Sequence, residues 1–150
     1  MSISVILMAA GLASARPHVI ASQTFDPNTD RATSVELIER PQGITDADFA
    51  QKLIDASGLR PWNGQPINFP ASPGGMGVRA VESGAGPEVH VYFVSSDSRT
   101  SGRVCRITRK YGGMAGWPRA QDWCASKFGL PPRKWEPPIK TVNVPIRAPK

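Results

Sequence analysis

Hydrophobic and polar positions alternate most regularly near the middle of the chain. In residues 88–96 (EVHVYFVSS), Val89, Val91 and Phe93 fall on one face of an extended segment, and the residues between them fall on the other. This period of two is the spacing of a β-strand. The same pattern predicts three further strands, at residues 33–39, 77–83 and 102–110. Short turns between neighbouring strands make an antiparallel meander the simplest arrangement.

A helical spacing replaces this alternation after Thr45. The Thr45 side chain can cap the first turn, and Asp46 and Asp48 follow where the helix dipole favours negative charge. The apolar residues then recur on one stripe, which consists of Phe49, Ala50, Leu53 and Ile54. Gly58 is typical of the position that ends a helix. The segment therefore predicts an amphipathic helix that packs on the sheet.

A second, shorter helix is predicted at residues 119–128 (RAQDWCASKF), after Pro118 and before Gly129. Its predicted inner face carries Ala120, Trp123 and Cys124, and the strand at 102–110 carries Cys105. Cys105 and Cys124 are the chain's only cysteines, and they lack the close pairing of a zinc site, so no metal site is predicted. We predict a Cys105–Cys124 disulfide that ties the last helix to the sheet, worth roughly 3 kcal/mol for a loop of about 20 residues.

The remaining segments divide the chain around one domain. Residues 1–15 predict a signal peptide, because an apolar run ends in Ala13-Ser14-Ala15; a buried N-terminal strand is the alternative. Residues 16–32 are polar and rich in turn formers, and predict a flexible arm. Residues 33–130 form the domain, and residues 131–150, with six prolines, predict an extended basic tail. The predicted location is the periplasm or the secreted space.

Composition agrees with a single domain of the α+β class. We expect an antiparallel sheet of three to four strands with two short helices. The 14 glycines and 15 prolines indicate long irregular connections, above all at residues 58–77. No apolar run is long enough to cross a bilayer, so no transmembrane segment is predicted. The sequence predicts no cofactor.

Charge is distributed unevenly along the chain. The net charge is +6, but residues 1–97 hold six Lys/Arg against ten Asp/Glu, whereas residues 98–150 hold twelve against two. Basic residues at both ends of the 102–110 strand can reach water, and aromatic residues follow them. The candidate binding surface comprises Arg99, Arg103, Arg109, Lys110, Tyr111, Trp117 and Arg119. A solvated face and a charge-protected strand edge would explain the same pattern.

Such a surface favours a non-catalytic binding module for an anionic envelope polymer or an acidic protein partner. One alternative is a small envelope hydrolase that uses His90, Asp97 and a serine within 95–98, although a histidine among valines is more often structural. Glu82 and Glu88 flank a hairpin turn and are most simply solubilising residues. A cytosolic nucleic-acid-binding protein is a further alternative, disfavoured because no recognition signature accompanies the basic residues.

Overall fold

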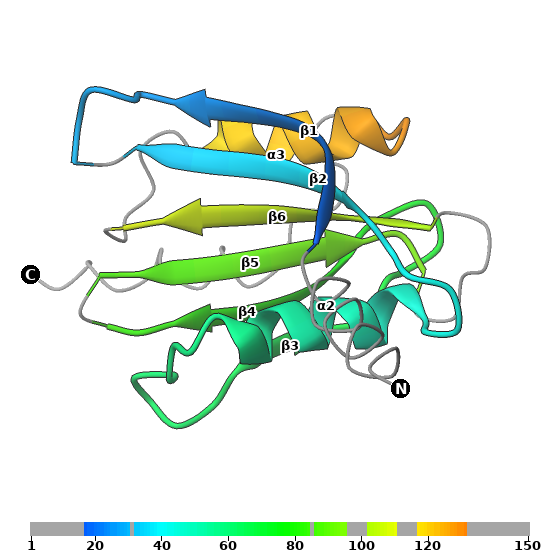
Figure 1. The fold of residues 1–150 in the computed structure, drawn as a ribbon, viewed down its shortest axis with the longest axis horizontal. Coiled ribbons are helices and arrows are strands. Elements are labelled where there is room, and N and C mark those ends of the chain that lie inside the picture. Colours follow the sequence, from blue (N-terminus) through cyan, green and yellow to red (C-terminus); the bar gives the residue numbers. More distant parts are fainter. Residues whose placement is uncertain (1–16, 31, 85, 96–101, 111–116, 132–150) are drawn as a thin grey trace, which may run out of the picture.

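One antiparallel sheet of six strands organises the protein, which we describe from a computed structural model at residues 17–30, 32–84, 86–95, 102–110 and 117–131 (Figure 1). The strands lie in the order β1-β2-β6-β5-β4-β3. Their bounds are β1 His18–Phe25, β2 Thr33–Glu39, β3 Ile67–Phe69, β4 Gly77–Glu82, β5 Glu88–Phe93 and β6 Arg103–Arg109. Two helices complete the described fold, α2 at Asp46–Ala56 and α3 at Trp117–Lys127.

The α+β class, the antiparallel pairing and the two helices are confirmed, but the sheet has six strands rather than three to four. The first extra strand, β1, lies in the segment predicted as a flexible arm. Most of its residues are exposed, so it lacks the buried alternation that identifies a strand. The second, β3, has three residues and lies within the proline-rich connection at 58–77. Both strands are held by pairing with a neighbour, which the sequence pattern does not record.

The connections explain the strand order. Strands β3 to β6 form a meander, and β1 and β2 form a hairpin that joins the meander along β6. Helix α2 connects the hairpin to the far edge of the sheet and packs on β4, β5 and β6. Its residues Phe49 and Leu53 are buried in one core cluster with Val89, Val91 and Phe93. The face assigned to these three strand residues from the sequence is therefore the α2 face.

The start of α2 follows the capping rule. The Thr45 hydroxyl accepts a hydrogen bond of 3.1 Å from the backbone amide of Asp48, which would otherwise have no partner within the helix. Close packing beneath the helix depends on Gly77 at the start of β4. A Cβ on Gly77 would lie 2.6 Å from the Phe93 ring, so this position admits no side chain without a shift of its neighbours.

Helix α3 covers the opposite face, where it packs on β2. The predicted disulfide is confirmed: Cys105 of β6 and Cys124 of α3 are bonded, with their Cα atoms 5.7 Å apart, and both are fully buried. Figure 1 shows that α3 starts at the end of the sheet where β6 finishes. The core on this side comprises Val35, Leu37, Met76, Val78, Ala80, Tyr92, Cys105, Ile107, Trp117, Ala120, Cys124 and Ala125.

Several predictions fall outside the described residues. They concern the signal peptide at 1–15, the tail beyond residue 131, and the side chains of Arg99 and Tyr111. Ser96, Asp97 and Ser98 also lie there. Within the described ranges, no helix combines the length and the apolar character that crossing a membrane requires.

Candidate functional site

A row of cross-strand partners crosses the sheet where α3 begins. Glu82 of β4 faces Glu88 of β5, Glu88 faces Arg109 of β6, and Arg109 faces Thr33 of β2. Directly opposed residues of antiparallel strands project their side chains to the same side of the sheet. Because Glu88 and Tyr92 share a parity on β5, this side is the α3 face. The strand register therefore gathers two acids and one base from three strands.

His90 lies one pleat further along β5 and joins the two acids. Its Nε2 atom is 3.1 Å from Oε1 of Glu88 and 3.5 Å from Oε2 of Glu82. The side chains of His90 and Glu88 are only 10% and 9% exposed, whereas that of Glu82 is 46% exposed. The ring of Trp117 meets the His90 ring edge to face, with 4.4 Å between centroids. We call Glu82, Glu88 and His90 the carboxylate–histidine cluster.

Arg109 closes the cluster from the side of β6. Its Nη1 atom lies 3.9 Å from Oε2 of Glu88, and its guanidinium lies over the Trp117 ring, 5.4 Å from the centroid. The side chain of Arg109 is fully buried, so the expectation that its charged group reaches water is wrong. The physical reason is the register: Arg109 stands opposite Glu88, and a buried cation is tolerated where an anion pairs with it.

The cluster changes the proton affinities of its members. Burial pushes the pKa of His90 down, but hydrogen bonds to Glu82 and Glu88 and the negative charges of both acids outweigh it, so the pKa is raised. The hydrogen bond from His90 holds the pKa of Glu82 below its usual value, against a smaller effect of burial. Burial raises the pKa of Tyr92, although Gln121 donates a hydrogen bond of 3.3 Å to its hydroxyl.

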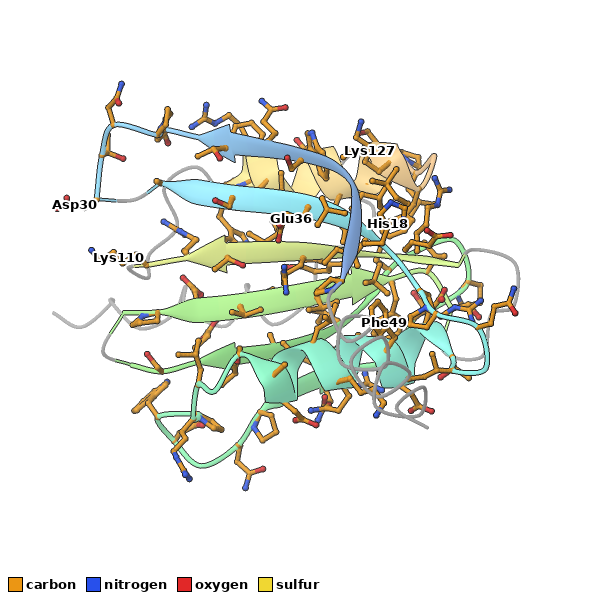
Figure 2. The ribbon with its side chains drawn as sticks, in the orientation of Figure 1. His18, Asp30, Glu36, Phe49, Lys110 and Lys127 are labelled. Carbon is orange, nitrogen blue, oxygen red and sulfur yellow. A yellow bond between two sulfur atoms is a disulfide. The ribbon has the colours of Figure 1, made fainter. Side chains whose placement is uncertain are left out.

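A second group of side chains follows one side of α3, where Arg119 and Lys127 are exposed and Trp123 packs in part against the core. Arg119, Trp123 and Lys127 recur every four residues, which places them along one face of the helix. The Arg119 guanidinium lies over the Phe25 ring of β1, 5.2 Å from its centroid, and pairs with Asp26 at 2.7 Å. The Lys127 ammonium lies 4.9 Å from the Trp123 ring centroid. Figure 2 shows Lys127 at the C-terminal end of the helix. We call Arg119, Trp123 and Lys127 the α3 stripe.

The structure brings together only part of the predicted binding surface. Arg109, Lys110, Trp117 and Arg119 gather at the end of the sheet where α3 begins, and Figure 2 shows Lys110 there beside the β1–β2 turn. Arg109 and Trp117 are buried among them, so the accessible members are Lys110 and Arg119. Arg103 lies at the opposite end of β6 and takes no part.

Sequence reasoning assigned Trp123 to the inner face of the predicted helix, where it does pack in part against the core, and it gave Lys127 no role. The spacing of four from Arg119 could have grouped both with Arg119 on one side of the helix. Sequence reasoning also treated Glu88 as a solubilising residue, whereas Glu88 is buried beside His90. The hydrolase alternative gains little from the geometry. His90 is directed at two glutamates, and Ser95 lies beyond the far end of β5.

Known proteins provide no template for either group of residues. No protein-family model, curated protein or solved structure matches the chain. A function must therefore be inferred from the carboxylate–histidine cluster and the α3 stripe themselves.

Proposed function

We propose that this protein is an exported, non-catalytic binding module that holds an acidic protein partner against the α3 stripe. Export is supported by the apolar run before Ala13-Ser14-Ala15, which has the length of a signal-peptide core. The Cys105–Cys124 disulfide supports it independently, because such bonds persist in oxidising compartments and are rare in the cytosol.

The observation that carries the proposal is the position of two exposed cations over aromatic rings. Arg119 lies over Phe25, and Lys127 lies over Trp123. A ring face attracts a cation and restrains its side chain, so less conformational freedom is lost when a partner binds. Tryptophan and arginine are also the residue types that contribute most to binding energy in protein interfaces.

The disulfide makes the α3 stripe a rigid platform. Cys124 follows Trp123 directly and is bonded to Cys105 in a central strand of the sheet. Ala120 and Ala125 bury the inner side of the helix against the same core. A contact surface that is already ordered before binding avoids much of the entropic cost of association.

The charge pattern favours a protein partner over an anionic polymer. Arg119 already pairs with Asp26, and Asp122 lies on the same helix as the two cations. Polyanion binding gains affinity with each phosphate that a cation neutralises, so it rewards long runs of basic residues. Two cations around a partly buried tryptophan, one of them already paired with Asp26, instead suit a short carboxylate-bearing segment with an apolar side chain for Trp123.

The test compares two double variants that lose the same net charge. R119Q/K127Q removes the cations of the α3 stripe, whereas K52Q/R60Q removes two exposed cations from α2 and the loop that follows it. Binding of fluorescently labelled poly-L-glutamate and of labelled heparin is measured by anisotropy at low and moderate salt. An exposed cation contributes about 0.2–1 kcal/mol, so two predict about a two- to thirty-fold loss of poly-L-glutamate affinity in R119Q/K127Q.

K52Q/R60Q should bind poly-L-glutamate as the unaltered protein does. Equal weakening in both double variants would mean that net charge alone drives binding, which refutes the role of the α3 stripe. Heparin binding that exceeds poly-L-glutamate binding and depends on Arg119 and Lys127 would replace the protein partner with an anionic polymer.

A further inference from the structure

We propose that Glu82, Glu88 and His90 form a binding site for one divalent transition-metal ion of the Zn²⁺ class. The three side chains each offer one ligand atom, and these atoms all lie within 4.8 Å of one another. They stand apart from the α3 stripe, so this site does not depend on the proposed function.

The distances between the ligand atoms suit a single small ion. Nitrogen and oxygen ligands lie about 2.0–2.2 Å from zinc, so neighbouring ligands of a tetrahedral site are roughly 3.3–3.5 Å apart. In the carboxylate–histidine cluster, Nε2 of His90 lies 3.1 Å from a Glu88 oxygen and 3.5 Å from a Glu82 oxygen. Small side-chain rotations are sufficient for one ion to contact all three residues.

Strand register holds the ligands in place. Glu82 and Glu88 are direct partners across the β4–β5 pair, and His90 follows Glu88 on the same face of β5. None of the three ligands lies on a long loop, so little ordering accompanies binding. A metal site that is assembled on paired strands keeps its geometry more tightly than one assembled on loops.

Neighbouring residues complete the arrangement. Arg109 approaches Oε2 of Glu88, the oxygen that does not face His90, and so orients this carboxylate. Trp117 packs edge to face against the His90 ring and limits its rotation. Contacts of this kind around the ligands are a regular feature of metal sites. The partly exposed Glu82 provides the route by which an ion and a water ligand can enter.

The ligand types define the class of ion. Imidazole nitrogen suits zinc and other later first-row metals, whereas calcium and magnesium prefer sites built from oxygen alone. Two carboxylates also outweigh the single positive charge of Arg109. The competing explanation is that the same residues form only an internal hydrogen-bonded network, and the experiment separates the two.

The full chain is produced without a histidine tag, treated with a chelator and dialysed against buffered ZnCl₂. Bound zinc is then measured by atomic emission, with excess Mg²⁺ and Ca²⁺ as competitors. Two variants remove ligands, E82Q at a partly exposed position and H90Q at a buried one. Two matched controls are H18Q, which removes the chain's other histidine, and D55N, which removes an exposed carboxylate of α2.

We expect one zinc per chain, retained in excess Mg²⁺ and Ca²⁺ and in both controls. E82Q and H90Q should each weaken zinc binding at least about tenfold, and circular dichroism reports whether each variant folds. If H90Q does not fold, E82Q alone decides. Failure of the unaltered protein to bind zinc would overturn the proposal, as would retention in E82Q or a loss that follows H18Q. The poly-L-glutamate assay reports on the α3 stripe separately.

Discussion

Reduction of the Cys105–Cys124 disulfide should destabilise the fold by a large and calculable amount. The two residues are 19 positions apart and close a loop of about 20 residues. The chain-entropy model assigns such a loop roughly 3 kcal/mol of stabilisation, because the crosslink restricts the unfolded chain. A domain of this size is stable by about 5–15 kcal/mol in total, so the disulfide provides a substantial share.

Urea unfolding followed by circular dichroism measures this contribution. For a protein of this length we take a denaturant slope of roughly 1.5 kcal/mol/M, so 3 kcal/mol lowers the unfolding midpoint by about 2 M. The comparison uses oxidised protein and protein that has been reduced and kept reduced. C105A/C124A serves as the control for the reductant, because its midpoint should not respond to it.

A fall in the midpoint of less than about 0.3 M would refute the loop-entropy reasoning for this protein. A third outcome is possible, in which the reduced protein keeps a native-like sheet signal and loses only the helix signal. It would mean that α3 detaches alone and that the disulfide stabilises only the docking of this helix.

Two further predictions concern single side chains. T45A should destabilise the protein by about 1 kcal/mol, because the Asp48 amide loses its capping partner. T45S keeps a capping hydroxyl, so its stability should stay within a few tenths of a kcal/mol of the unaltered protein. Equal urea midpoints for T45A and T45S would contradict the capping role. Burial raises the pKa of Tyr92, so the folded state binds this proton more tightly than the unfolded state and stability should fall as pH rises above the usual tyrosine value of about 10. Absorbance at 295 nm should then show that one of the two tyrosines of the folded protein does not ionise near pH 10, and Y92F should lack this resistant tyrosine. Ionisation of both tyrosines near pH 10 in the unaltered protein would contradict the prediction.

The sequence could predict those elements whose buried apolar residues recur with the period of a strand or of a helix. Strands β2, β4, β5 and β6 each place alternate residues in a core cluster, so their hydrophobic period is visible in the chain. Helix α2 is similar, because its buried residues share one stripe and Thr45 caps its start. The disulfide followed from the same logic, since Cys105 and Cys124 both fall on inner faces.

The edge strands could not be predicted in this way. Strand β1 has only two partly buried residues, Ala21 and Phe25, and a register irregularity between Val19 and Ala21 interrupts its period. Its position depends on backbone hydrogen bonds to β2, which almost any residue other than proline permits. An edge strand of this kind is defined by its partner rather than by its own hydrophobic pattern.

The candidate site could not be predicted either, because it depends on how neighbouring strands pair. The alternation along β6 puts Arg109 on the same face as Cys105 and Ile107, but it does not indicate which residue of β5 stands opposite. That residue is Glu88, and the pairing buries both charges beside His90. A slip of one residue between β5 and β6 would send these side chains to opposite faces of the sheet. Register thus decides whether the same residues form a solvated basic strand or a buried cluster with metal-ligating potential.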